Sequence, residues 1–455
     1  MIPIAKLLFL VLALGARPLP SAIGQEPDAP RRPKNLVLMI ADGFGPASRT
    51  MARVCAGRPL VLDGLLVGSA STHATNSLVT DSAAAATALA CGVKTSNGAI
   101  ALDPQGKPLA TLLEAAEERG MWTGLVTTTQ LSHATPAAFA AHVRSRVEQS
   151  AIALQQLERD IEVLMGGGRE FLLPQAQGGE RRDDRNLFAL AEERGYTIVE
   201  SATALAGVTV PPLLAIFGAG QMHYEIDREP LGGDQPSLEA MTRKALELLA
   251  ASEEGFFLLV EGGRIDHAGH ANDSAAHLHD VLAYDRAVAA ALEFARADGA
   301  TLLVSTADHE TGGLTLSRDV DGRPGYTWKP EVLNGVRSSV DGLVFRLRSA
   351  EDWRPVLAEW TGIGDWSPAE VGEVEAALAE PAGSAALPAA LREAIDRRAF
   401  IGWTTGGHTG IDVEVFAFGP QSERLRGHRD NAELGGLLAE LLGFHLADLT
   451  EALRR

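Results

Sequence analysis

The sequence has little of several things, and each shortage excludes a class of protein. Only two of its 455 residues are cysteine, Cys55 and Cys91, so no disulfide framework can be inferred. They could pair, but Cys91 lies in the apolar run ALACGV and is expected to be a buried free thiol. Lysine and arginine number 40 against 59 acidic residues, and the net charge of −19 argues against a nucleic-acid-binding module. After the first 24 residues, no apolar run approaches the roughly 18 residues of a membrane span.

The first 24 residues have the pattern of a secretory signal peptide. Lys6 supplies a short positive region, residues 7–16 (LLFLVLALGA) an apolar stretch, and Ala22-Ile23-Gly24 a small-residue cleavage site. An uncleaved anchor is the alternative. The pattern favours export, so the chain is expected to be periplasmic or secreted, with residues 1–24 removed.

Short apolar runs alternate with helical patterns along the rest of the chain. Strand-length runs lie at 35–41, 122–128, 161–165, 213–217, 256–260, 301–306 and 413–418. Helical patterns lie at 82–90, 110–119, 136–142, 150–158, 237–250, 275–297 and 432–443. This alternation predicts an α/β fold with a large, mostly parallel sheet covered by helices on both faces. Hydrophobic content of 46% is enough for a substantial core.

Asp42 and Ser82 are the first two candidate site residues, and each has an ordinary structural alternative. Asp42 lies in Ala-Asp-Gly-Phe-Gly directly after an apolar run, where a tight glycine turn would face its carboxylate into a crevice, although a solvated turn is the alternative. Ser82 follows Thr80 and Asp81 at the start of an alanine-rich run, and any of the three could cap that helix. A serine there would also meet the positive end of the helix dipole, which favours an alkoxide and a bound phosphate oxygen.

The segment from Glu261 to His270 is more specific, because it places carboxylates and imidazoles directly after the run FFLLV. Asp266 and His270 are four residues apart, so on a helical turn they present an oxygen and a nitrogen to one point. Zinc takes this mixture of ligands. Glu261 ends the preceding strand and could reach a second, harder ion.

Two further segments repeat the theme of ligand-type side chains at strand ends. Asp308 and His309 follow LLVST, and His408 lies in a glycine-rich turn before VEVFAFG. Together the segments supply enough carboxylate and imidazole for two or three divalent ions. Six histidines match no ligand position and are expected to be surface or packing residues: His73, His142, His223, His277, His279 and His428.

The spread of these candidates predicts the domain organisation. They run from Asp42 to His408, and one site cannot be shared by independently folded halves, so residues 35–455 are expected to form a single catalytic domain. The stretch from about 314 to 400 contains no candidate ligand and has helical patterns near 367–379 and 389–398. We expect it to be an insertion near the mouth of the site, where it would either gate access or pair subunits.

At this point the segments resemble a known family. The strings TDSAAAATA, HATPAAFAAHVRSR (133–146), VEGGRIDHAGH, TADHETGG and GGHTG closely resemble motifs of the alkaline phosphatases, in the same order. The resemblance covers most of the chain from about residue 35 to 445, apart from 314–400. It implies an alkaline phosphatase-like fold and a broad-specificity, metal-dependent phosphomonoester hydrolase. That enzyme would release inorganic phosphate through a covalent phosphoserine intermediate.

The resemblance also implies roles for individual residues. Ser82 would be the nucleophile, and Arg146 would grip the phosphate oxygens with its planar fork. The implied metal ligands form three groups: Asp266, His270 and His408 for one Zn²⁺; Asp42, Asp308 and His309 for a second Zn²⁺; and Thr135 and Glu261, with Asp42 again, for one Mg²⁺. His133 and His267 would lie beside the metals, where the enteric bacterial form has Asp and Lys. Losing that lysine would weaken product binding and leaves the identity of the third metal open.

Two other classes of protein remain as alternatives. Sulfatases of the same superfamily need a modified Cys or Ser followed by Pro and Arg, which Ser82-Ala83-Ala84 lacks. Phosphodiesterases generally lack the third metal and the gripping arginine, so small phosphomonoesters are the favoured substrates. A protein that only binds metal or phosphate would have no use for a serine nucleophile. Family members are commonly dimers, so a homodimer is possible.

Overall fold

A ten-stranded sheet organises the described part of this computed structural model, which is residues 32–320, 322 and 325–455. The strand order is β14-β2-β13-β8-β1-β7-β3-β4-β6-β5. All neighbouring pairs are parallel except β13 with β2 and β13 with β8, which confirms the mostly parallel sheet. The predicted signal peptide, residues 1–24, lies outside the described residues, and residues 32–455 form one compact unit.

Seven strands lie where apolar runs predict them: β1 (Asn35–Ile40), β3 (Trp122–Gln130), β4 (Val163–Gly167), β6 (Leu213–Ile216), β7 (Phe256–Glu261), β8 (Thr301–Thr306) and β13 (Val413–Phe418). Three others have no such run: β2 (Leu66–Ser71), β5 (Thr197–Val199) and β14 (Gly427–Asp430). Every residue of β1, β7 and β8 is buried. Strands covered on both faces need continuous apolar runs, so the sequence predicts the central strands. It does not predict the edge strands β5 and β14, or β2, which lies next to β14.

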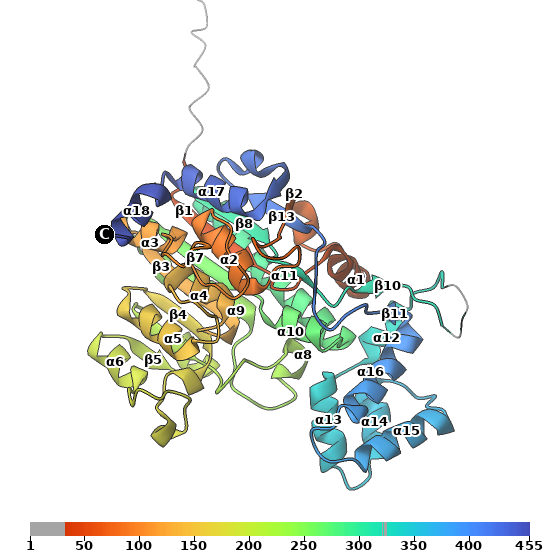
Figure 1. Cartoon of the computed structure of the whole chain (residues 1–455). Helices are drawn as coiled ribbons and strands as arrows, with labels where there is room; N and C mark the ends of the chain where they lie inside the picture. The colour runs from red at the N-terminus through yellow and green to blue at the C-terminus, as the bar shows by residue number, and fades with distance from the viewer. Residues whose placement is uncertain (1–31, 321, 323–324) are drawn as a thin grey trace, which may run out of the picture. The chain divides into compact units, whose positions relative to one another are not determined.

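Helices cover both faces of the sheet, as predicted (Figure 1). One layer packs around α9 and α11, and contains α1 (Pro46–Ala56), α8 (Glu225–Arg228), α9 (Leu238–Leu249), α10 (Arg264–His270) and α11 (Ser274–Asp298). The other contains α2 (Ser82–Cys91), α3 (Leu112–Glu118), α4 (Ala134–Ala140), α5 (Gln149–Glu158), α6 (Leu187–Glu193), α17 (Asn431–Leu442) and α18 (Leu446–Leu453).

Residues 317–400 leave the sheet through two short antiparallel ladders. Strand β9 (Glu310–Thr311) pairs with β12 (His408–Thr409), and β10 (Thr315–Leu316) pairs with β11 (Ile401–Gly402). Beyond them lie α12 (Pro330–Gly335), α13 (Val340–Ser349), α14 (Trp353–Thr361), α15 (Pro368–Leu378) and α16 (Ala386–Ala399). We call α12–α16 the helical segment. Two of its helices match the predicted patterns, and the prediction missed the other three.

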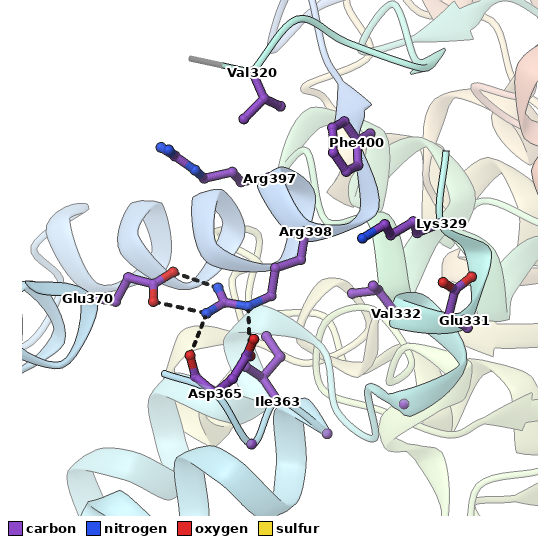
Figure 2. A pocket seen from close by; sticks show the side chains of 13 residues that line it. Val320, Lys329, Glu331, Val332, Ile363, Asp365, Glu370, Arg397, Arg398 and Phe400 are labelled. Atoms are coloured by element: carbon purple, nitrogen blue, oxygen red, sulfur yellow. Dashed lines mark hydrogen bonds and ion pairs between the residues drawn. The ribbon is translucent and has the colours of Figure 1, made fainter. Parts of the chain in front are cut away.

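The helical segment contains a hollow of about 540 Å³, and its lining includes the ion-paired Arg398. Figure 2 shows the Arg398 guanidinium between two carboxylates, bound to both oxygens of Glu370 at 2.5 and 2.9 Å and to Asp365 at 3.3 Å. None of the candidate site residues lines this hollow. Among the described residues, no helix is both long and apolar enough to cross a membrane. Cys55 and Cys91 are free thiols, and Cys91 is buried, as expected.

Candidate active site

Three neighbouring parallel strands bring their terminal carboxylates to one edge of the sheet. Strand β1 lies between β7 and β8, and Ile40 is opposite both Glu261 and Thr306. Asp42 therefore follows β1 at the level where Glu261 ends β7 and Asp308 follows β8, and all three side chains are fully buried. The carboxyl edge of a parallel sheet is where α/β proteins place their sites.

A glycine turn positions the first of these carboxylates, as the sequence predicts. Gly43 has φ +78° and donates its N–H to Asp308 Oδ1 at 3.2 Å. A Cβ at this position would lie 2.6 Å from the Asp266 Cα, so only glycine lets β1 turn this close to α10.

Asp81, not Ser82, caps helix α2. The Asp81 carboxylate accepts a hydrogen bond from the Ala84 N–H at 3.0 Å, and Ser82 is the first helical residue. The Ser82 hydroxyl is thus free of capping, and its Oγ lies 3.2 Å from His309 Nε2 while the residue is 1% exposed. The structure therefore removes the main structural alternative for this serine.

The first candidate cation group surrounds that hydroxyl. His309 Nε2 lies 3.2 Å from Asp308 Oδ2 and 3.5 Å from Asp42 Oδ1. Ligand atoms of these three fully buried residues lie within 4.8 Å of one another. The group is the one that the resemblance predicts beside Ser82.

The second group contains Asp266, His270 and His408. His270 Nε2 is 3.3 Å from Asp266 Oδ2 and 3.1 Å from His408 Nε2, and His408 Nε2 is 3.6 Å from Asp266 Oδ1. Each imidazole donates its Nδ1–H to a backbone carbonyl, His270 to Gly406 at 2.7 Å and His408 to Thr80 at 2.8 Å. The Nε2 atoms of both rings therefore face the carboxylate, and the hydrogen bond to Asp266 raises the pKa of His270 to about 8. A cation at this point would take the place of that proton.

The third group is richer in oxygen. Asp42, Glu261 and His133 have ligand atoms within 4.8 Å of one another, and His133 Nδ1 lies 3.9 Å from Glu261 Oε1. The other Glu261 oxygen accepts hydrogen bonds from Thr127 and Thr129, which orient the carboxylate. Thr135 is fully buried at the start of α4.

Unsatisfied acceptors distinguish these groups from an ordinary polar core. Five buried oxygens in or beside the first and third groups have no hydrogen-bond partner: both Asp42 oxygens, Asp308 Oδ2, Glu261 Oε1 and Thr135 Oγ1. Burial, then the charge of Asp308, raises the pKa of Asp42, and burial, then the charge of Asp266, raises the pKa of Asp308 to about 7. Buried acceptors and crowded negative charge are costly unless cations compensate them, so the residues fit metal ions.

Arg146 and two histidines line the same region. Arg146 donates from Nη2 to His133 Nε2 at 2.9 Å and from Nη1 to Asp81 Oδ2 at 3.3 Å, and its side chain is 25% exposed. The His133 and His267 rings meet edge to face at 5.6 Å. Burial and the nearby Arg264 charge lower the pKa of His267 to about 3, so this histidine is neutral. The structure thus brings all twelve predicted residues together.

Sequence reasoning missed the residues that orient the ligands. Thr127, Thr129, Thr311 and Arg264 contact Glu261, Asp266 or His267, yet threonine and arginine at strand and helix ends carry no distinctive signal. Of the six other histidines, none belongs to the three groups within the described residues. His277, for example, is a buried packing residue bonded to Ser48 and Ile265.

Comparisons with known proteins agree with this geometry. A family model described as Alkaline phosphatase matches residues 33–444. The repressible alkaline phosphatase of Saccharomyces cerevisiae is 37% identical over 500 residues, covering 98% of this chain and 87% of that protein. A cold-active alkaline phosphatase structure from a psychrophilic Shewanella species has a TM-score of 0.83 at 37% identity, covering 90% of this chain and 99% of the other.

A more distant structure carries a metal. A mutant of the alkaline phosphatase from the Antarctic bacterium TAB5, with Mg bound, has a TM-score of 0.68 at 25% identity and covers 92% of this chain and 100% of the other. The family match spans nearly all the described residues, and the yeast relative is covered over most of its length. The chain therefore belongs to the alkaline phosphatase family of phosphomonoester hydrolases.

Proposed function

We propose that this enzyme hydrolyses a broad range of phosphomonoesters through a covalent phosphoserine on Ser82. The observation that carries the proposal is the position of the Ser82 hydroxyl. It is released from capping by Asp81, buried, and 3.2 Å from His309 Nε2 in a group of candidate cation ligands. A serine that served only the helix would cap it.

Two Zn²⁺ and one Mg²⁺ fit the ligands. Mixed carboxylate and imidazole donors suit zinc in the group Asp42–Asp308–His309. They also suit zinc where Asp266, His270 and His408 converge. The oxygens of Asp42, Thr135 and Glu261 suit magnesium, in keeping with the TAB5 mutant that has Mg bound. Bound there, the ions supply positive charge that lowers the cost of ionising a hydroxyl and of gathering phosphate oxygens.

The residues of this chain divide the remaining work. Ser82 Oγ attacks phosphorus and loses its proton, while the bond from phosphorus to the substrate oxygen breaks and an alcohol leaves. Water then attacks the phosphoserine, the bond between phosphorus and Oγ breaks, and Ser82 regains a proton as inorganic phosphate departs. Arg146 orients two phosphate oxygens in both steps, because its guanidinium lies beside Asp81 and His133 at the same site.

The proposal also includes the location and the partners of the enzyme. Residues 1–24 would direct export to the periplasm or medium. Small phosphomonoesters would be the partners, and the chain would act without a nucleic-acid-binding module, as a homodimer. Residues 314–400 would be an insertion near the mouth of the site, where it would either gate access or pair subunits.

Replacing the nucleophile tests the covalent route. In Ser82→Ala, hydrolysis of an aryl phosphomonoester is expected to fall roughly a thousandfold or more, because the attacking oxygen is gone. Elemental analysis should find wild-type metal content, since the ligand groups are intact. Ser77→Ala, in the loop that precedes α2, is the matched control and should retain activity.

Trapping the intermediate gives an independent readout. Acid quenching of wild type with a radiolabelled phosphomonoester should leave label on Ser82, and the Ser82→Ala protein should take up none. Undiminished turnover in that variant, or label on another residue, would contradict the proposal. Faster hydrolysis of diesters than of monoesters would contradict the substrate class.

A further inference from the structure

One buried hydroxyl touches a ligand in each of the two groups assigned to zinc. Thr311 Oγ1 lies 2.5 Å from Asp266 Oδ1 and 3.2 Å from His309 Nδ1. Thr311 is 0% exposed, so water does not compete for either contact. The family resemblance assigns Asp266 to the group with His270 and His408, and His309 to the group with Asp42 and Asp308. Ligand atoms of Asp266, His309 and His408 also lie within 4.8 Å of one another, so the two groups are neighbours.

The direction of both hydrogen bonds follows from the chemistry of the three groups. A carboxylate only accepts, so the single hydroxyl hydrogen of Thr311 goes to Asp266. The Thr311 oxygen must then accept the other bond, which places a hydrogen on His309 Nδ1. His309 Nε2 is left facing the Asp308 and Asp42 carboxylates and the Ser82 hydroxyl.

His309 differs in this respect from the other two candidate histidine ligands. His270 and His408 donate their Nδ1–H to backbone carbonyls, which no substitution removes. His309 donates to a side chain. The tautomer of His309 therefore depends on the identity of residue 311, and this dependence can be tested by mutation.

The surroundings of Thr311 keep its hydroxyl in place. Its N–H donates to the Gly43 carbonyl at 3.1 Å, and in the β9–β12 ladder it is opposite His408. Two glycines leave room for it, because a Cβ at Gly43 would lie 2.9 Å from Thr311 Oγ1 and one at Gly269 would lie 3.0 Å from Thr311 Cβ. The hydroxyl is thus held between the turn after β1, helix α10 and the ladder.

We propose that Thr311 is a positioning residue that orients one ligand in each zinc site through a single hydroxyl. The inference rests on the proposed zinc ligands and adds a residue that supports both sets. Groups that hydrogen-bond metal ligands typically contribute about 10–100-fold to metal affinity. Removing this hydroxyl is therefore expected to weaken zinc binding at both sites together, instead of at one.

Zinc affinity of the full-length protein, stripped of metal and titrated against a chelator, measures this effect without using activity. Thr311→Val keeps the shape and loses the hydroxyl, so both binding steps should weaken by about 10–100-fold. Thr311→Ser keeps the hydroxyl and should stay within about threefold of wild type. Thr409→Val is the matched control, because Thr409 lies on the same ladder but donates to Glu310, and its zinc affinity should match wild type.

The outcomes separate this inference from the proposed function. If wild type binds no zinc, the proposed function fails. If wild type binds zinc and Thr311→Val binds it equally well, or weakens only one site, the role of Thr311 is overturned. Thr311→Ser is decisive if the valine variant does not fold, since a tenfold or greater loss in the serine variant would show that packing, not the hydroxyl, is what matters.

Discussion

Two sets of buried aspartates, one at the site and one beneath the helical segment, have opposite hydrogen-bonding states. Asp42 and Asp308 have buried oxygens without a donor. At the junction with the helical segment, Asp227 accepts from Ser338 Oγ at 2.8 Å and from Ser339 N at 3.0 Å. Two further junction aspartates are also bonded: Asp273 accepts from Val340 N at 2.6 Å, and Asp396 from Ser274 Oγ at 2.5 Å.

The difference teaches which buried carboxylates bind cations and which attach one part of the fold to another. A carboxylate oxygen that already accepts a hydrogen bond fixes its donor in place and gains little from a metal. An unbonded one is a cost to the fold until positive charge arrives. In the helical segment, the buried atoms without partners are donors, such as the indole N–H groups of Trp328 and Trp366, which cannot bind a cation.

The largest effect on activity should come from removing the cations that the aspartates of the site need and the junction aspartates do not. Chelation of the wild-type enzyme is expected to reduce phosphomonoester hydrolysis roughly a thousandfold, or by about 4 kcal/mol of barrier. It should also lower the unfolding temperature, because Asp42, Glu261 and Asp308 then repel one another. Zinc and magnesium should restore both properties. If protein that elemental analysis shows to be free of metal kept full activity, the unbonded carboxylates of the site could not be explained as cation ligands.

The next effect should appear when a bonded aspartate is removed. Asp227→Ala leaves the Ser338 and Ser339 hydroxyls without their acceptor, so the free energy of unfolding should fall by about 2–3 kcal/mol. Its kcat should stay near wild type, because Asp227 touches no candidate ligand. Urea unfolding and steady-state kinetics measure the two quantities, with Asp341→Ala, at an exposed position of α13, as control. A large fall in kcat at unchanged stability would contradict the view that Asp227 only attaches the helical segment to the rest of the fold.

The smallest effect concerns the pH dependence of the junction. Burial raises the pKa of Asp396 to about 7 from 3.8, so between these values the folded protein holds a proton that the unfolded chain has released. Stability from this group is therefore present at low pH and is lost as pH rises through the window. Asp396→Asn cannot titrate and still offers Ser274 an acceptor. Between pH 4 and 7, the free energy of unfolding of this variant relative to wild type should rise by about 1 kcal/mol or more, as measured by urea unfolding. If the free energy of unfolding of the two proteins changed with pH in the same way, the titration of Asp396 would not contribute to stability.

The sequence predicts the middle of the sheet better than its edges. Buried strands such as β1 and β7 must be continuously apolar, and both lie where expected. Strand β2 reads LVGSAS and is only partly buried, so nothing in its composition distinguishes it from a loop. Helices α13 and α14 were missed because their packing against neighbouring helices, and not a strong local pattern, determines where they form.

The site shows a similar division. Asp42, Glu261 and Asp308 could be inferred from strand ends alone, since parallel strands share an edge. Thr135 and Arg146 were found only through the family resemblance, because neither has a local pattern that departs from an ordinary helix start or surface charge. Thr311 was missed by both routes, as its role depends on distances across two chain segments.

The two short ladders below the helical segment have an evolutionary consequence. Leu316 is opposite Ile401, so the chain leaves and returns at nearly the same point. Residues can be gained or lost between these positions without displacing Asp308 or His408, as in other tolerated insertions.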